Sequence, residues 1–153
     1  MQNYSRTSRA RPVLYSMFII LAVAFLTFPA SAVEAAVLAR VDLARQRMEV
    51  YIDGRRQHVW VVSTGRDGWQ TPPGKYYPFG LARQYYSNQW KMNLTYLVWI
   101  SRDGIAIHGT DLSGKLGRPA SHGCIRLSIA DAATFYGLVQ SHGLDNTEVI
   151  VAR

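Results

Sequence analysis

The single cysteine of the chain, Cys124, lies in the segment Ser-His-Gly-Cys-Ile-Arg-Leu at residues 121–127. A lone cysteine cannot form an internal disulfide, so it is a buried spectator, an intermolecular link or a reactive thiol. A cysteine nucleophile needs a group that takes or holds its proton, and main-chain N–H groups where an oxyanion develops. Because the neighbouring residue types supply both, the sequence predicts nucleophilic catalysis at Cys124.

Two histidines and one arginine are candidates to assist Cys124. His122 precedes it by two residues and His108 by sixteen. Arg126, two residues beyond, would point the same way in an extended segment, where its charge would favour thiolate and could hold a carboxylate. Gly123 permits a sharp turn that aims consecutive N–H groups at one point. Spacing alone leaves the base undecided, since catalytic Cys and His are often adjacent only in space.

The N-terminus is typical of an export signal. Three arginines without nearby acidic residues precede an almost wholly apolar run at residues 13–28, and the small-residue site Pro-Ala-Ser-Ala follows at 29–32. This order predicts a signal peptide over residues 1–32, cleaved after Ala32. The alternative is an uncleaved membrane anchor, because the uncharged run at 12–33 is long enough to span a bilayer.

Length and composition predict one globular domain, and the export signal predicts that it lies in the periplasm or cell envelope. The chain has 153 residues, of which 48% are hydrophobic and 18% charged. Cleavage would remove three of the 17 basic residues and none of the ten acidic ones, lowering the formal net charge from +7 to +4. No basic run is interleaved with aromatic residues, so we expect no nucleic-acid partner, and membrane contact only through the N-terminal signal.

The elements that must position these residues are mostly short strands. Turn-rich stretches lie at residues 65–74 and 109–120, and His108 is expected at the exit of a strand. One helix is predicted between Ser128, which with Asp131 resembles a capping box, and Gly143. The pattern predicts a mostly-β, sandwich-like fold of packed sheets with one main helix after Cys124. The expected strands are 37–43, 48–52, 58–63, 76–79, 94–100, 105–107 and 147–151.

Several motifs together resemble the L,D-transpeptidase catalytic domain, the YkuD-type domain. The most specific are Ile-His-Gly-Thr at 107–110 and the Ser-His-Gly-Cys block at 121–127, separated by a glycine-rich loop. Ser-Thr-Gly at 63–65 and Thr-Pro-Pro-Gly at 71–74 are similar to the family's StG…TPxG segment. Residues 44–48 resemble its first hairpin, with a polar-Gln-polar turn. The resemblance implies a catalytic domain over residues 37–153.

The resemblance also implies roles for the residues around Cys124. Cys124 would be the nucleophile and His108 the general base, with the Gly109 carbonyl orienting the imidazole. Backbone N–H groups of His122 and Gly123, with that of Cys124, would line the oxyanion site. These implied roles decide between the two histidines where spacing does not.

Further residues are expected around the substrate. Ser121 is placed in the same pocket, and the resemblance implies that Arg126 holds the donor peptide. Part of the family carries Asn in place of this Arg, so donor recognition does not transfer from that group. Tyr85, Tyr86 and Trp90 precede the strand that leads to His108, and we hypothesise that they form a wall or lid over Cys124.

The reaction implied by the resemblance is acyl transfer between peptidoglycan stem peptides without a cofactor. A tetrapeptide donor would lose D-Ala to give a thioester, and a side-chain amine of a second stem would accept the acyl group. Water as acceptor would make an L,D-carboxypeptidase, and a lysine of an envelope protein would make an anchoring enzyme. Two other classes remain open: a zinc site formed by His108, His122 and Cys124, and a non-catalytic cell-wall-binding module.

Overall fold

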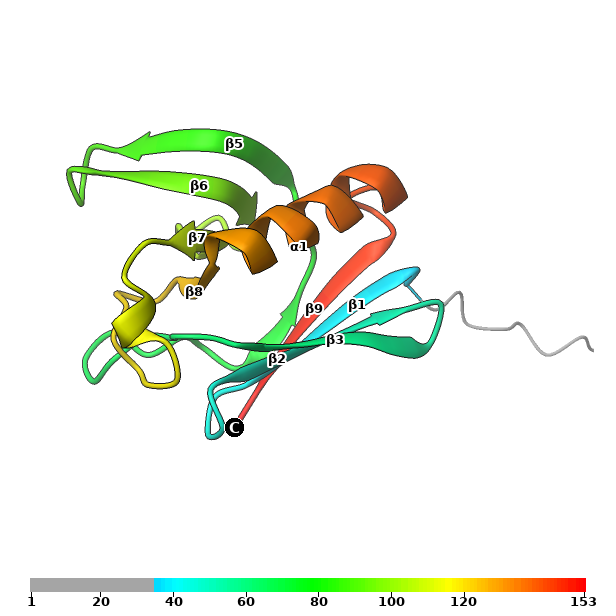
Figure 1. Cartoon of the computed structure of the whole chain (residues 1–153), viewed down its shortest axis with the longest axis horizontal. Helices are drawn as coiled ribbons and strands as arrows, with labels where there is room; N and C mark the ends of the chain where they lie inside the picture. Colours follow the sequence, from blue (N-terminus) through cyan, green and yellow to red (C-terminus); the bar gives the residue numbers. More distant parts are fainter. Residues whose placement is uncertain (1–34) are drawn as a thin grey trace, which may run out of the picture. The chain divides into compact units, whose positions relative to one another are not determined.

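The computed structural model describes residues 35–153, which form two sheets and one main helix (Figure 1). The predicted signal peptide, residues 1–32, lies outside the described residues. The strands are β1 (Val37–Asp42), β2 (Arg47–Ile52), β3 (Arg55–Val61), β4 (Gly74–Tyr76), β5 (Gly80–Ser87), β6 (Met92–Trp99), β7 (Ala106–Thr110), β8 (Ile125–Ser128) and β9 (Thr147–Ala152). The helices are the short 3₁₀ helix η1 (Ser113–Lys115) and α1 (Ile129–His142).

The first sheet joins the two ends of the domain. Its order is β3-β2-β1-β9-β4, with β1 antiparallel to β2 and parallel to β9. Alternate β1 residues Val37, Ala39 and Val41 are buried, as expected for a strand with one face on the core. The sheet therefore forms one wall of the domain.

The second sheet carries the segment around Cys124. Its order is β5-β6-β7-β8, and β7 and β8 are parallel. The connection between them runs through η1 and the loop that ends at Cys124. Helix α1 follows β8 directly and packs on β6, β7 and β8, as Figure 1 shows. Residues of both sheets and α1 share one core, which confirms the mostly-β prediction with one main helix.

The helix begins and ends as its sequence predicts. Ser128 is the N-cap: its hydroxyl accepts a hydrogen bond from the Asp131 N–H at 3.1 Å and donates to the Asp131 carboxylate at 2.6 Å. At the other end Gly143 has φ +96°, and its N–H donates to the Val139 carbonyl. Within residues 35–153, no helix combines the length and apolarity needed to cross a bilayer.

A bulge in β6 divides its side chains between two environments. The register with β7 shifts after Thr95, and Tyr96 has φ +51°, which is uncommon for a residue with a side chain. Met92 and Leu94, before the bulge, line the cavity that contains Cys124. Tyr96 instead meets Tyr136 of α1 edge to face, with ring centroids 5.9 Å apart.

Four segments differ from the predicted elements, and one of them is β8, which was not expected as a strand. Strand β5 was not expected, because its exposed polar and aromatic residues do not alternate; it is an edge strand that pairs only with β6. The strand predicted at 76–79 is replaced by β4, which ends at Tyr76. Strand β7 continues to Thr110, so His108 lies inside the strand rather than at its exit.

Candidate active site

Cys124 lies in a cavity of about 140 Å³ at one end of the second sheet. The sheet supplies Met92, Leu94, His108 and Arg126, the turn before β8 supplies Ser121, His122 and Cys124, and the β5–β6 connection supplies Trp90. Six of these eight lining residues are ones that the sequence singles out. Met92 and Leu94 have no reactive group that would mark them in the sequence, so only the fold shows that they line the cavity.

The parallel pairing of β7 and β8 brings the distant histidine to the cysteine. His108 is paired with Arg126, and Ile107 with Ile125. Because side chains alternate along a strand, Ile125 is buried in the core while Cys124 and Arg126 face the cavity together with His108. The fifteen residues between His108 and Cys124 are thus spanned by one crossover.

His108 is a buried, neutral imidazole of defined tautomer. The side chain is 3% exposed, and Nδ1 lies 2.8 Å from the Gly109 carbonyl oxygen. Since a carbonyl can only accept a hydrogen bond, Nδ1 carries the proton and Nε2 of the neutral ring has a free lone pair. Burial lowers the pKa of His108 to about 4; the Gly109 hydrogen bond opposes this and the charge of Arg126 adds to it.

Cys124 is held as a thiol. Burial raises its pKa, against the opposing effects of the Ala106 main-chain N–H and the Arg126 charge. Sγ lies 3.6 Å from the Gly104 carbonyl oxygen, a geometry in which the thiol donates. Near neutral pH the resting pair is therefore neutral thiol and neutral imidazole rather than thiolate and imidazolium.

The turn before Cys124 is fixed by its own hydrogen bonds. Gly123 has φ +110°, a conformation that favours glycine. The Ser121 hydroxyl accepts from the Gly123 N–H at 3.1 Å and donates to the Cys124 carbonyl at 2.5 Å. Gly123 was expected to offer its N–H to an oxyanion, but this N–H is already engaged. Among the described residues no hydrogen bond occupies the N–H groups of His122 and Cys124.

Thr71 ties the turn to the Thr-Pro-Pro-Gly segment. Its hydroxyl donates to the Gly123 carbonyl at 2.7 Å and accepts from the Gly65 N–H at 2.9 Å. Gly65 has no room for a side chain, because a Cβ there would lie 1.8 Å from the Trp69 carbonyl oxygen. The two motifs at 63–65 and 71–74 are thus parts of one support beneath the Cys124 turn.

Gln46 continues this support to the first hairpin. Its buried side chain donates to the Leu43 carbonyl and to Thr64 Oγ1, both at 2.7 Å, and accepts from the Thr64 N–H at 2.8 Å. The sequence noted Gln46 and Thr71 only as parts of resembling motifs. Their role in holding the turn becomes visible only in the hydrogen bonds.

An aromatic cluster covers the side of the cavity at His122. The Trp90 ring stacks on the His122 ring at 4.1 Å, and Trp69 meets both rings edge to face, at 5.1 Å from His122. Trp69 was not anticipated, because its glycine-rich loop gives no indication of which surface it meets. Tyr85 and Tyr86, 40% and 51% exposed, are not among the residues that line the cavity.

The zinc alternative has no set of ligands in this part of the chain. Within residues 35–153, no three His, Cys, Asp or Glu side chains lie close enough together to hold a metal ion.

This strand-borne His–Cys pair and its supporting turn coincide with a known domain. The family model of the YkuD L,D-transpeptidase catalytic domain matches residues 36–151. The chain belongs to this family.

Solved structures of the family share the fold. The chain resembles an L,D-transpeptidase from Mycobacterium smegmatis (22% identity, TM-score 0.70, covering 78% of this chain and 59% of that one). It also resembles an L,D-transpeptidase from Stackebrandtia nassauensis (27% identity, TM-score 0.67, covering 84% of this chain and 62% of that one). A third is L,D-transpeptidase 3 from Mycobacterium tuberculosis in complex with a faropenem-derived adduct (25%, 0.63, 77% and 60%). The chain thus spans about three fifths of the length of these structures, and no curated protein sequence matches it.

Proposed function

We propose that this protein is an exported L,D-transpeptidase that cross-links peptidoglycan stem peptides through a thioester on Cys124. The observation that carries the proposal is the geometry of His108: a neutral imidazole with a free Nε2 lines the same cavity as the only thiol. Because the family acts on peptidoglycan, membership in it indicates the class of substrate on which His108 and Cys124 would act.

In the first half-reaction Cys124 Sγ attacks the carbonyl carbon between the third residue and the terminal D-Ala of a tetrapeptide. The thiol proton passes to His108 Nε2, and the developing oxyanion is met by main-chain N–H groups of the turn. The Cys124 N–H is the suitable donor, because that of Gly123 is engaged with Ser121. The imidazolium then gives its proton to the leaving nitrogen, the C–N bond breaks and D-Ala departs.

In the second half-reaction an amine attacks the thioester carbonyl. His108 Nε2 takes a proton from the attacking amine and returns it to Sγ as the C–S bond breaks. An amine from the third residue of another stem gives a cross-link. Water gives a carboxypeptidase product, and a lysine of an envelope protein gives an anchored protein; these are the alternatives within the family.

The chemistry needs no cofactor, because nucleophile, base and oxyanion donors all come from the chain. Arg126, beside His108 in the cavity, is proposed to hold the donor, and Trp90 to form part of the cleft wall. Export through residues 1–32 would bring the domain to its substrate in the envelope.

The test is incubation of residues 33–153 with disaccharide-tetrapeptide, followed by mass spectrometry. A dimer formed with loss of D-Ala supports transpeptidation, whereas a tripeptide product supports carboxypeptidation. Cys124→Ala is the control and should give neither product. If the unmodified protein gives neither and Cys124 is never acylated, the chain is a binding module and the proposal fails.

The penem adduct of the Mycobacterium tuberculosis structure suggests a second probe. We expect a carbapenem to acylate Cys124, detected as a mass increase that is absent in Cys124→Ala. His108→Gln should slow the acylation by about 10²- to 10⁴-fold, because a general base contributes a factor of that size.

A further inference from the structure

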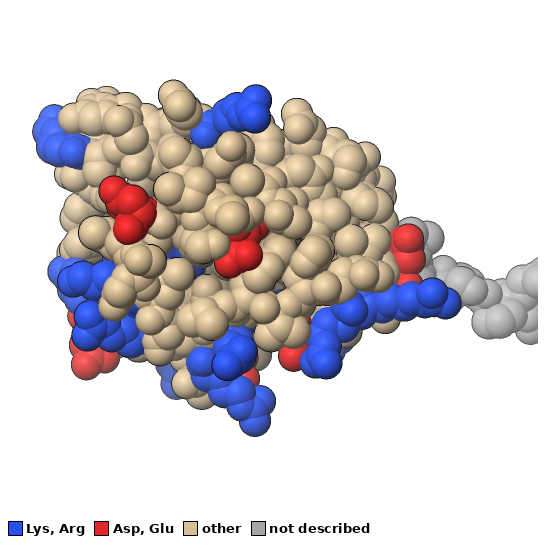
Figure 2. Space-filling model, in the orientation of Figure 1, with Lys and Arg blue, Asp and Glu red and all other residues tan. Residues whose placement is uncertain are grey.

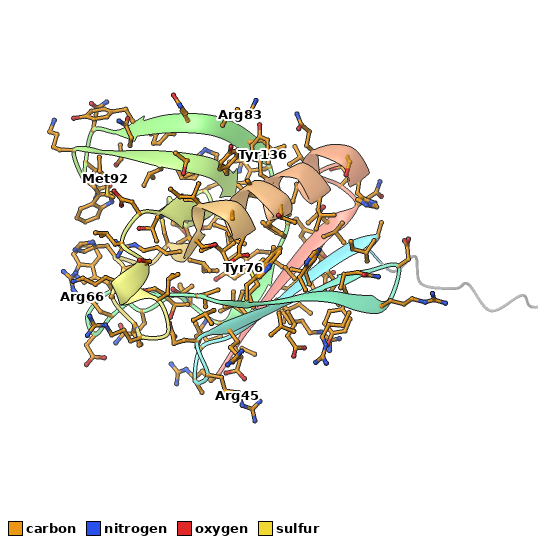
Figure 3. The ribbon with its side chains drawn as sticks, viewed as in Figure 1. Arg45, Arg66, Tyr76, Arg83, Met92 and Tyr136 are labelled. Atoms are coloured by element: carbon orange, nitrogen blue, oxygen red, sulfur yellow. The ribbon has the colours of Figure 1, made fainter. Side chains whose placement is uncertain are left out.

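Two arginines from different segments of the chain, Arg126 and Arg66, lie close to the turn that carries Cys124. Arg126 lines the cavity, and its main chain pairs with Ser63. Three residues beyond Ser63, the Arg66 N–H donates to the Ser121 carbonyl at 3.1 Å. Figure 3 shows Arg66 at the end of the domain where Met92, a residue of the cavity wall, also lies. Figure 2 shows more basic than acidic side chains at this end.

The charges are near enough to act on one another. The pKa of Arg126 is lowered by burial and by Arg66, against the opposing effect of Cys124. Burial, Arg66 and Arg126 together lower the pKa of His122. Like charges held together cost free energy unless an anion compensates them.

The described part of the chain supplies no such anion. Within residues 35–153 the ion pairs are Arg45–Asp42, Arg56–Glu49 and Lys75–Glu148, so neither Arg66 nor Arg126 has an acidic partner. Asp67, adjacent to Arg66 in sequence, lines a different cavity, beside Gln46 and Arg153.

The hydrogen bonding of Arg126 is also incomplete. Its Nη1 makes one long bond, 3.4 Å, to the Ala120 carbonyl. Its Nε is the one buried side-chain nitrogen or oxygen of residues 35–153 without a partner. A buried N–H that lacks an acceptor is costly, and it commonly marks a place where a ligand completes the bonding.

We infer that Arg66 and Arg126 form a carboxylate-binding site that selects donors by the free C-terminal carboxylate of their last residue. This inference rests on the proposed function. In a tetrapeptide that carboxylate is only one residue beyond the carbonyl attacked by Cys124, within about 4 Å. A guanidinium fork suits a carboxylate by charge and by shape. The site thus favours tetrapeptides over C-terminally amidated stems, and it is vacated when D-Ala leaves.

The charge of the site is tested without any peptidoglycan substrate. Cys124 is alkylated in parallel with iodoacetate and with neutral iodoacetamide, and the ratio of the two rate constants is measured. A changed thiol pKa affects both reagents alike, so the ratio reports on attraction of the carboxylate. We expect Arg66→Gln to lower the ratio about threefold to fivefold, because Arg66 is exposed.

The controls separate a local effect from net charge and from misfolding. In Arg66→Lys the ratio of the iodoacetate to the iodoacetamide rate constant should stay close to that of the unmodified protein. Arg45→Gln, on the remote β1–β2 turn, should leave this ratio unchanged. Arg126→Gln should lower it about tenfold, as expected for a charge-assisted hydrogen bond. If Arg126→Gln does not fold, the Arg66 variants still decide: an unchanged ratio in Arg66→Gln overturns the site.

Donor selection is tested with tetrapeptide and its C-terminal amide, both of which keep the same peptide bond for attack. We expect kcat/KM for the acid to exceed kcat/KM for the amide by about tenfold. Arg66→Gln should reduce this difference between the two substrates. Equal rates for acid and amide overturn the inference while leaving the proposed function intact. If neither peptide reacts but the alkylation ratio responds to Arg66, the proposed function fails and the anion site stands.

Discussion

At the scale of single residues, burial sets the protonation state of the two reacting groups. His108 and Cys124 are each driven toward the neutral form by the removal of water, and Arg126 lowers the pKa of both. An exposed Cys–His pair near an arginine would instead favour the ion pair. Under the proposed function this resting state needs proton transfer during attack, with His108 as the proposed general base in each half-reaction.

This protonation state has a consequence for the pH dependence of the reaction. His108 loses its function as a base only when protonated, so the acid limb of kcat/KM should lie near pH 4 rather than near the ordinary value of 6.5. Steady-state rates on tetrapeptide between pH 3.5 and 8 would measure it. Arg126→Gln should move the limb upward, because loss of the nearby positive charge raises the pKa of His108. A limb at pH 6 to 7 in the unmodified protein would contradict the assignment.

At the scale of elements, the Cys124 turn is a short loop supported by residues from elsewhere in the chain. Ser121 closes the turn from within, and Thr71 holds it from the Thr-Pro-Pro-Gly segment. The Gln46 side chain accepts a hydrogen bond from the Thr64 N–H. The next residue, Gly65, donates its N–H to the Thr71 hydroxyl. The position of Cys124 thus depends on hydrogen bonds that begin in the first hairpin.

Replacement of Thr71 tests this support. Thr71→Val keeps the shape but leaves the Gly65 N–H and the Gly123 carbonyl without partners. We expect the free energy of unfolding to fall by about 2 kcal/mol and kcat to fall by about tenfold or more. Urea unfolding and steady-state kinetics measure the two effects. Thr134→Val on the exposed face of α1 is the matched control and should change neither.

The aromatic residues of the β5–β6 hairpin give a second test at this scale. Trp90 stacks on His122 at the cavity, whereas the Tyr85 ring meets Trp99 and Tyr86 is half exposed. Trp90→Ala should therefore raise KM for tetrapeptide about fivefold to tenfold, while Tyr86→Ala should not. An equal rise in both variants would mean that the whole hairpin, rather than the Trp90 ring, contacts the substrate.

At the scale of the whole molecule, the buried base makes the fold sensitive to acid. Unfolded His108 takes up a proton below about pH 6.5, but the folded side chain does so only near pH 4. Between these values the unfolded state binds more protons, so the free energy of unfolding decreases as the pH falls. The loss from this single group amounts to about 3 kcal/mol over that interval.

Denaturant unfolding at pH 7 and pH 4.5 measures this effect. The unmodified protein should lose more stability than His108→Gln across the interval, because glutamine does not titrate. His58→Gln, on exposed strand β3, provides the comparison and should behave as the unmodified protein does. Parallel losses in His108→Gln and the unmodified protein would show that other groups dominate the acid response.

The sequence by itself determined the features whose causes are local. The single thiol, the glycine before it and the cap residues at both ends of α1 act within a few positions, and the structure bears out the cap residues and the need for glycine at 123. The family resemblance, confirmed by the domain match, added the fold.

Only the tertiary structure decided which distant residues meet. Pairing of β7 with β8 sets His108 beside Arg126, the β6 bulge separates the cavity-lining Met92 and Leu94 from Tyr96, and Trp69 reaches His122 from a loop. Such contacts depend on strand register and loop path, which are set by burial over the whole core rather than by neighbouring residues. For the same reason the sequence could not show that Arg66 and Arg126 lie near each other, with neither forming an ion pair to an acid within residues 35–153.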